Sequence, residues 1–162
     1  MIIKRTLKRI KKSDGKFNTN EVYYVLNVLE NSKNKNIDYV KKLEEKFCKL
    51  YKVKYAIACN SGTSGLHSAL FSLNLKKDDE VIIPGLTVVM DAYAAIHLGL
   101  KPVFCDVDSD TFLVTAENIK KKITKKTKAI MLVSLQGLPI DIDPIINLAK
   151  KYNLKIIEDN AQ

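Results

Sequence analysis

The run Ala129-Ile130-Met131-Leu132-Val133 is apolar at five consecutive positions, and this pattern decides the fold class of the chain. A strand with one face in water alternates apolar and polar residues, whereas a strand covered on both faces is apolar throughout. Similar runs recur, so strands are expected at 55–59, 80–83, 102–105, 128–134 and 154–158. The stretches between them predict helices near 64–74, 87–98, 115–122 and 141–152, with N-caps at Thr115 and Asp141. This alternation predicts an α/β fold with a mostly parallel, doubly wound sheet.

The first part of the chain has a different pattern. Residues 21–29 and 38–50 carry apolar side chains at helical spacing, and Asp38 is a suitable N-cap for the second of these helices. A polar break at 31–36 separates them. We therefore divide the chain into an amino-terminal segment, 1–37, and a domain that covers 38–162.

The composition bounds the class of protein. The 162 residues are 46% hydrophobic and 28% charged, which is typical of a globular chain. No apolar stretch approaches the roughly 18–20 residues that span a bilayer, and the amino terminus lacks the apolar region of a signal peptide. We expect a cytoplasmic protein with no membrane partner.

Cysteine and histidine usage predicts no metal site. Cys48, Cys59 and Cys105 show no C-x-x-C spacing, so reduced and mostly buried thiols are expected. His67 and His97 have no metal-like partner in the sequence, and a structural role is expected for both.

The chain is basic. It contains 27 Lys and Arg against 18 Asp and Glu, a net charge of +9, which raises the question of nucleic acid or phosphorylated ligands. No helix-turn-helix, aromatic RNP motif or zinc finger accompanies the charge. We expect solvated basic faces and no nucleic-acid partner, with generic DNA binding as an alternative.

The segment Ser61-Gly62-Thr63-Ser64-Gly65 follows the apolar run 55–59. A glycine-containing turn at a helix start presents free N–H groups and the positive end of the helix dipole, which suit a phosphate. A simple N-cap and tight turn is the alternative. The segment matches neither the Walker loop nor the dinucleotide fingerprint.

The segment Glu158-Asp159-Asn160-Ala161-Gln162 follows the apolar residues of 154–157. In α/β proteins ligands bind outside the carboxyl ends of parallel strands. A carboxylate in this position holds a metal or the cation of a cofactor; a charged pair that simply enters solvent is the alternative.

Together these segments resemble the DegT/DnrJ/EryC1/StrS family of pyridoxal-phosphate sugar aminotransferases. The resemblance runs from Val40 to Gln162 and rests on six blocks in order: 59–70, 79–84, 101–108, 127–130, 137–143 and 157–162. It implies that 38–162 form part of the large domain of a fold-type I pyridoxal-phosphate enzyme. It also implies that the rest of that domain and a small carboxy-terminal domain lie beyond this sequence.

The resemblance assigns cofactor contacts by motif. Gly62 and Thr63 match the turn that binds the cofactor phosphate, Asp159 matches the residue paired with the pyridine nitrogen, and Gln162 matches the residue beside the ring hydroxyl. Val88 stands where the family usually has an aromatic residue that stacks on the ring. A second departure is Ser134-Leu135-Gln136-Gly137, where the family usually reads H-L-Y-G. Both departures fall near the expected site, so the substrate or the reaction type can differ from common transamination.

No lysine of this chain matches the family's Schiff-base lysine, which lies beyond the E-D-x-A-Q motif, so no catalytic residue is assigned here. The resemblance implies the amino-terminal part of an enzyme of polysaccharide biosynthesis that is a homodimer at full length. Such an enzyme transfers an amino group from a donor such as glutamate to a nucleotide-linked keto sugar. The alternatives are a family dehydratase, with histidine in place of the lysine, and a non-catalytic fragment. For the chain alone we expect inactivity and, because a sheet edge would be exposed, poor solubility.

Overall fold

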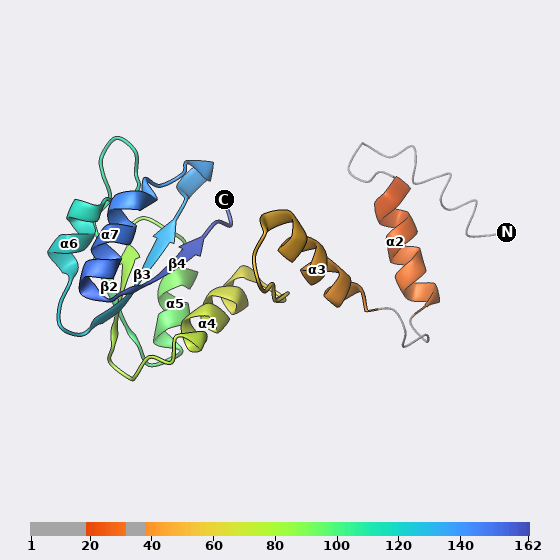
Figure 1. The fold of residues 1–162 in the computed structure, drawn as a ribbon, viewed down its shortest axis with the longest axis horizontal. Helices are drawn as coiled ribbons and strands as arrows, with labels where there is room; N and C mark the ends of the chain where they lie inside the picture. The colour runs from red at the N-terminus through yellow and green to blue at the C-terminus, as the bar shows by residue number, and fades with distance from the viewer. Residues whose placement is uncertain (1–18, 32–37) are drawn as a thin grey trace. The chain divides into compact units, whose positions relative to one another are not determined.

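A computed structural model describes residues 19–31 and 38–162 of the protein (Figure 1). The chain forms two compact units, which divide between Ala58 and Cys59. The predicted boundary at 37/38 falls beside residues that are not described, and it stays a prediction.

The first unit contains the helices α2 (Thr19–Glu30) and α3 (Tyr39–Tyr51). The predicted cap of α3 is confirmed, because Asp38 Oδ1 accepts a hydrogen bond from the Lys41 N–H at 3.0 Å. The helix ends where Lys52 adopts a left-handed conformation, with φ of 53°. The apolar side chains of α3 are solvent-exposed within this unit: Val40, Leu43, Phe47 and Leu50.

The predicted strand at 55–59 is wrong. This run has no regular secondary structure, and Tyr55 and Ile57 are 73% and 80% exposed. The Ala58 N–H donates to the Glu44 carboxylate at 2.9 Å rather than to a strand. An apolar run of strand length becomes a strand only where another strand supplies backbone partners, and the sheet of the described residues lies elsewhere.

The second unit is a four-stranded parallel sheet with helices on both faces. The strands β1 (Glu80–Pro84), β2 (Lys101–Cys105), β3 (Thr127–Val133) and β4 (Lys155–Asp159) are ordered β2-β1-β3-β4. The helices are α4 (Gly62–Ser72), α5 (Met90–Ile96), α6 (Ala116–Lys122) and α7 (Ile142–Tyr152), and a 3₁₀ turn, η1, spans Leu135–Gly137. The α/β class, the parallel sheet and four of the five predicted strands are confirmed.

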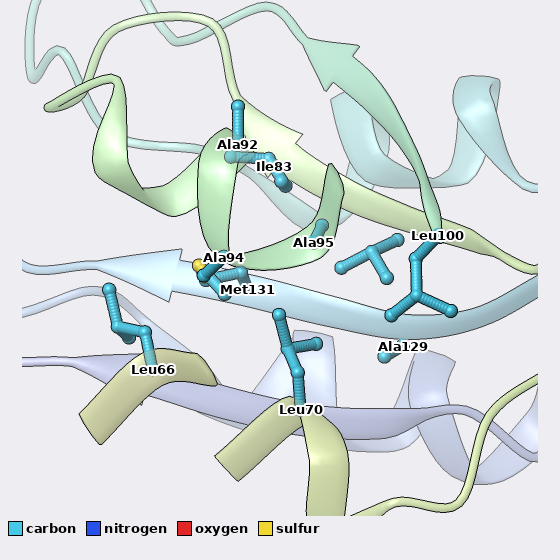
Figure 2. Close-up of a cluster of buried hydrophobic side chains, with 10 residues drawn as sticks. Leu66, Leu70, Ile83, Ala92, Ala94, Ala95, Leu100, Ala129 and Met131 are labelled. Carbon is cyan, nitrogen blue, oxygen red and sulfur yellow. The ribbon is translucent and has the colours of Figure 1, made fainter. Parts of the chain in front are cut away.

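Each face of the sheet has its own hydrophobic core. On one face α4 and α5 pack against alternate residues of the central strands, including Ile83 and Met131, which Figure 2 shows with Leu66 and Leu70 of α4. On the other face α6 and α7 cover Ile82, Ile130 and Leu132. Because neighbouring strand residues face opposite ways, continuous apolar runs satisfy both cores.

The helix starts follow the predicted caps in part. Thr115 Oγ1 accepts from the Asn118 N–H at 3.2 Å and caps α6 as predicted. Asp141 holds the N-cap position of α7 without a side-chain hydrogen bond to the helix. The expectation of mostly buried thiols is wrong, since Cys105 alone is buried, while Cys48 is half-buried and Cys59 is exposed.

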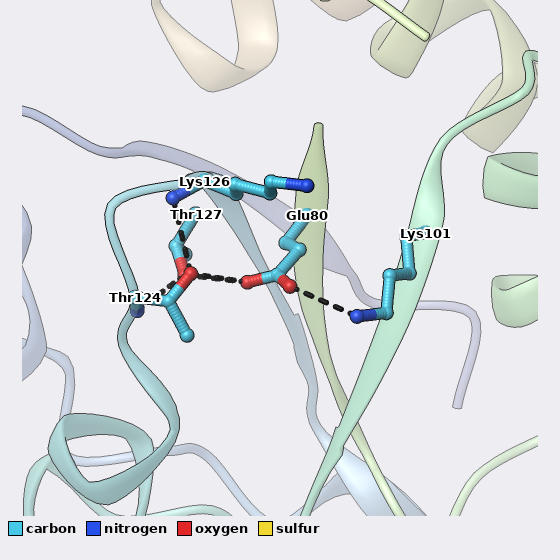
Figure 3. Close-up of polar contacts among 5 residues, drawn as sticks. All are labelled: Glu80, Lys101, Thr124, Lys126 and Thr127. Carbon is cyan, nitrogen blue, oxygen red and sulfur yellow. Dashed lines mark hydrogen bonds and ion pairs between the residues drawn. The ribbon is translucent and has the colours of Figure 1, made fainter. Parts of the chain in front are cut away.

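A buried carboxylate joins the strands at the amino-terminal edge of the sheet. Glu80 is 5% exposed, and its carboxylate accepts from Thr124 Oγ1 at 2.5 Å and pairs with Lys101 Nζ at 3.1 Å (Figure 3). The Glu80 N–H also donates to the carbonyl of Lys126. Together these contacts hold the start of β1 between β2 and the turn before β3.

Within 19–31 and 38–162, each helix is too short or too polar to cross a membrane.

Candidate functional site

The polar segments that follow β1, β3 and β4 lie at the carboxyl edge of the sheet. All four strands are parallel, and the register pairs Val133 with Asp159, so the ends of β3 and β4 are level. The β1 strand ends at Pro84 and continues into the loop with Thr87 and Val88. This edge of a parallel sheet is where α/β proteins bind ligands.

The start of α4 also points toward this edge. A short connection, 73–79, leads from the end of α4 to the start of β1, so the first turn of the helix lies toward the opposite, carboxyl edge. Figure 2 agrees, since Leu66 lies nearer the arrowhead of β3 than Leu70 does. The helix α4 packs against α5 and β4.

The first turn of α4 has the features of an anion site. Ser61 Oγ accepts from the Ser64 N–H at 3.1 Å, and the Gly65 N–H donates to the Ser61 carbonyl. The structure gives the N–H groups of Gly62 and Thr63 no acceptor within the described residues. A Cβ added to Gly62 would meet nothing within 4 Å, so the space beside it is open. Two unused donors and the positive end of an eleven-residue helix suit a phosphate.

Asp159 faces the side of the sheet that α4 and α5 cover. Ile157, two residues earlier on β4, packs against the core beneath these helices, and alternate strand residues share a face. Glu158 is exposed and lies on the opposite face, with Ile156. One oxygen of Asp159, Oδ1, is held at 2.9 Å by the Ala161 N–H. A half-buried, oriented carboxylate at a strand end suits the binding of a cationic nitrogen.

A second carboxyl group, Asp91, lies beside Asp159. Asp91 is on the first turn of α5 and is 1% exposed. Its Oδ2 accepts a 2.5 Å hydrogen bond from Thr87 Oγ1, while its Oδ1 is buried and accepts no hydrogen bond within the described residues. Burial, together with repulsion by Asp159, raises the pKa of Asp91 to about 6. The hydrogen bond from Thr87 opposes this increase.

The end of β4 is tied to the loop after β3. The Gln136 N–H donates to the side chain of Gln162 at 2.7 Å, and Ser134 Oγ bonds to Asn160 Oδ1 at 3.0 Å. Gln136 has a φ of 53°, a left-handed conformation that turns its N–H toward Gln162. These bonds fix the end of β4 and Gln162 at the carboxyl edge.

Val88 lies in the β1–α5 loop at the same edge and is 54% exposed. Its carbonyl accepts from the Asp91 N–H at 3.1 Å, which fixes the loop at the start of α5. An exposed branched side chain in this place offers an apolar contact to a ring but no aromatic stacking.

A cavity of about 580 Å³ opens between the loops that follow β2 and β3, on the side of α6 and α7. Its lining includes three carboxylates, Asp108, Glu117 and Asp141. This acidic lining does not suit a phosphate. The described residues contain no group of three or more His, Cys, Asp or Glu side chains that could hold a metal ion.

All five predicted site residues therefore lie in the second unit, and Val88, Asp159 and Gln162 follow strand ends at one edge. Sequence reasoning missed Asp91 and Thr87, whereas the 134–137 segment was expected near the site. One signal was available for Asp91, since it is the only charged residue in the apolar run from Val88 to Ile96.

Comparison with known proteins identifies relatives that match most of this chain, including all the candidate site residues. Residues 16–162 match the DegT/DnrJ/EryC1/StrS aminotransferase family. A GDP-perosamine synthase from Escherichia coli O157:H7 is 43% identical over 125 residues, which are 77% of this chain and 34% of that protein.

Solved structures give the same result. The aminotransferase from Psychrobacter cryohalolentis matches with a TM-score of 0.84 and 37% identity, over 90% of this chain and 37% of that one. An E. coli GDP-4-keto-6-deoxy-D-mannose-3-dehydratase with bound hydrated PLP matches with a TM-score of 0.82 and 30% identity, over 91% and 39%. The chain thus spans between about a third and two fifths of the length of these relatives.

Proposed function

This chain belongs to the DegT/DnrJ/EryC1/StrS aminotransferase family, and we propose that it forms the cofactor-binding part of a pyridoxal-phosphate-dependent sugar aminotransferase. The observation that carries the proposal is the arrangement at the carboxyl edge of the sheet. A helix start with unused N–H donors and an oriented carboxylate at the end of β4 match the phosphate and the pyridine nitrogen of one cofactor.

Gly62 and Thr63 hold the cofactor phosphate in this proposal. The two backbone N–H groups and the Thr63 hydroxyl donate hydrogen bonds to the phosphate oxygens, and the dipole of α4 adds attraction. The glycine leaves the space beside the helix start open.

Asp159 holds a proton at the pyridine nitrogen through an ion pair. When bound, pyridoxal phosphate supplies a protonated ring that accepts the electron pair released at the substrate carbon. Gln162 donates to the ring hydroxyl through its amide group, and Val88 covers one face of the ring with an apolar contact.

For the whole protein we propose an enzyme that moves an amino group from a donor such as glutamate to a nucleotide-linked keto sugar. The similarity to a GDP-perosamine synthase supports a nucleotide-linked substrate. A cytoplasmic homodimer, a role in polysaccharide biosynthesis and a large domain that starts at residue 38 belong to the same proposal.

The second candidate is a dehydratase of the same family. The similarity to a GDP-4-keto-6-deoxy-D-mannose-3-dehydratase supports it, at lower identity than the match to the aminotransferase structure. The coding sequence after codon 162 discriminates the two. A serine and then a lysine at the family's spacing would support the aminotransferase, and a histidine in the lysine position would support the dehydratase.

The cofactor site is tested with Asp159→Asn and with Glu158→Gln as its matched control. Both changes remove one carboxylate charge from neighbouring positions of β4, but only Asp159 lies on the face covered by α4 and α5. Loss of a hydrogen-bonded ion pair is expected to weaken pyridoxal-phosphate binding by about 10- to 100-fold, measured by absorbance or fluorescence titration. Equal affinities for the two variants, or no binding by the unmodified chain, would contradict the proposal.

A further inference from the structure

The surroundings of the Asp91 carboxyl group are unfavourable for an ionised carboxylate. It is almost completely buried in the first turn of α5, one oxygen accepts from Thr87, and the other oxygen receives no hydrogen bond. A buried acceptor that bears charge and lacks a donor is strongly unfavourable, so such a group holds its proton to a higher pH than an exposed carboxyl group does. With a proton on Oδ1, Asp91 becomes a hydrogen-bond donor.

The acceptor available to that donor is Asp159. Asp159 is the charged group that acts on Asp91, so the two carboxyl groups lie near each other, and the unpartnered Oδ1 of Asp91 can donate once it carries a proton. Because Asp159 Oδ1 is already held by the Ala161 N–H, its other oxygen remains for Asp91 and for a ligand. Two carboxylates close together repel each other, so a proton held by Asp91 removes this repulsion.

We propose that Asp91 is a positioning residue, which shares one proton with Asp159 and thereby orients the carboxylate that meets the cofactor nitrogen. The proton lies on Asp91, which donates to Asp159 and accepts from Thr87. The pair then carries one negative charge, which matches the single positive charge of a protonated pyridine ring. This role toward the cofactor rests on the proposed function, whereas the shared proton does not.

Apart from Asp159, no neighbouring charge accounts for the raised pKa of Asp91 within the described residues. The elements that pack most closely against α5 are α4, β1 and β2, and residues of β3 share its core. Within the described residues, Asp159 is the one charged group that acts on the pKa of Asp91. The other titratable residues of α5 and its neighbouring elements are Tyr93, His97, His67, Glu80, Lys101 and Cys105.

The raised pKa of Asp91 determines in which direction the stability of the folded chain changes with pH. Since the pKa of Asp91 is raised from 3.8 to about 6 in the folded chain, the folded state binds more protons than the unfolded state between these values. Stability is therefore expected to fall as the pH rises through this interval and to become independent of the pair above it.

The first test uses the cofactor-free chain. Infrared spectra at pH 5 are expected to show a neutral carboxyl band that disappears at pH 7.5 and is absent from Asp91→Asn. Between pH 4 and 6.5, the free energy of unfolding should depend less on pH in that variant than in the unmodified chain. If the band and the slope are unchanged in Asp91→Asn, the shared proton is refuted.

The second test uses pyridoxal-phosphate binding. Asp91→Asn keeps a donor toward Asp159 and an acceptor for Thr87, so binding should persist. It should lose the change with pH that is expected near pH 6 for the unmodified chain. Asp91→Val removes both groups and should weaken binding about tenfold. Equal binding by the Asn and Val variants would overturn the positioning role. If the infrared band is present while the chain binds no cofactor, the shared proton stands and the proposed function fails.

Discussion

Ser61 shapes the start of α4 with both its backbone and its side chain. Its φ of −159° is extended, which lets the chain enter the helix, and its Oγ accepts from the Ser64 N–H. We predict that Ser61→Ala lowers the free energy of unfolding by about 1 kcal/mol, measured by urea denaturation, because the helix loses its cap. Ser72→Ala at the other end of α4 is the control, since its hydroxyl only donates to the Ala69 carbonyl on an exposed surface. Equal losses in the two variants would show that Ser61 does not act as a cap.

The residues of the candidate site differ in how far the sequence predicts them. Thr63 and Asp159 belong to recognisable polar segments next to apolar runs, so their place at a helix start and a strand end was predictable. The burial of Asp91 near Asp159 was not, because the two residues are 68 positions apart in sequence and only the packing of the fold brings them together. The left-handed conformation of Gln136 likewise follows from its hydrogen bond to Gln162 rather than from its own residue type.

At the scale of elements, Glu80 connects β1 to β2 and to the turn before β3. Hydrogen bonds from Thr124 and Lys101 hold the pKa of Glu80 below its usual range, although burial opposes them. A lowered pKa means that Glu80 stabilises the folded chain above pH 4.5, the ordinary value, and that this contribution is lost as the pH falls through the folded-state pKa. We predict that Glu80→Gln flattens this acid limb of the stability profile, measured by thermal unfolding from pH 7 to pH 3.

Glu117→Gln is the matched control for Glu80. Its carboxylate also forms an ion pair, with Lys121 at 2.8 Å, but its side chain is 79% exposed. Exposed pairs on a helix contribute little to stability, so this variant is expected to keep the acid limb of the unmodified chain. An equal effect of both substitutions would mean that the network in Figure 3 does not hold the strands.

Met131 is the central core residue of β3 on the face of α4 and α5 (Figure 2). Its side chain is completely buried, so Met131→Ala removes apolar contacts and leaves a cavity. We predict a loss of about 2–5 kcal/mol in the free energy of unfolding, measured by urea denaturation. Met90→Ala, at a position that is 36% exposed, should change stability much less. A loss below that of Met90→Ala would show that this core is not packed around β3.

The sequence predicted the strands correctly where both faces of a strand are buried by other parts of the same chain. The strands β1 to β4 each contribute to two cores, and that requirement is visible as a continuous apolar run. The run 55–59 shows the same pattern but lies outside the sheet, because a pattern records apolar character and does not identify the strand that pairs with it. The observed starts and ends of the helices differ from the predicted ones by up to three residues. A helix end also depends on backbone geometry, as at Asp141, which holds the N-cap position without a side-chain hydrogen bond.

At the scale of the whole molecule, the sequence separates an amino-terminal part from a domain, but it does not indicate a division between Ala58 and Cys59. The amphipathic pattern of α3 predicts a helix with one face covered, yet its apolar side chains are exposed within the first unit. A sequence pattern specifies which face of a helix is apolar but not what covers that face. The strand order β2-β1-β3-β4 was not predicted either, because it depends on how the connections between strands cross the sheet.

The second unit also exposes apolar side chains, which predicts self-association of the chain. Tyr93 and Ile96 of α5 are 44% and 48% exposed, and Phe71 of α4, which packs beside α5, is 70% exposed. In addition, β2 and β4 each pair with one strand only in the described part of the chain, so each leaves an edge of backbone donors and acceptors. Contiguous apolar surface and open strand edges both favour association in water.

We predict that the chain forms concentration-dependent oligomers and that the double change Tyr93→Ser, Ile96→Ser shifts it toward the monomer. Sedimentation velocity over a hundredfold range of concentration measures the effect. Phe112→Ser is the control, because Phe112 is 54% exposed in the loop between β2 and α6. If the α5 surface drives association, the double variant should sediment as a monomer at concentrations where the control still associates. Equal sedimentation of both variants would assign association to the strand edges instead, and a monomeric unmodified chain would contradict the prediction altogether.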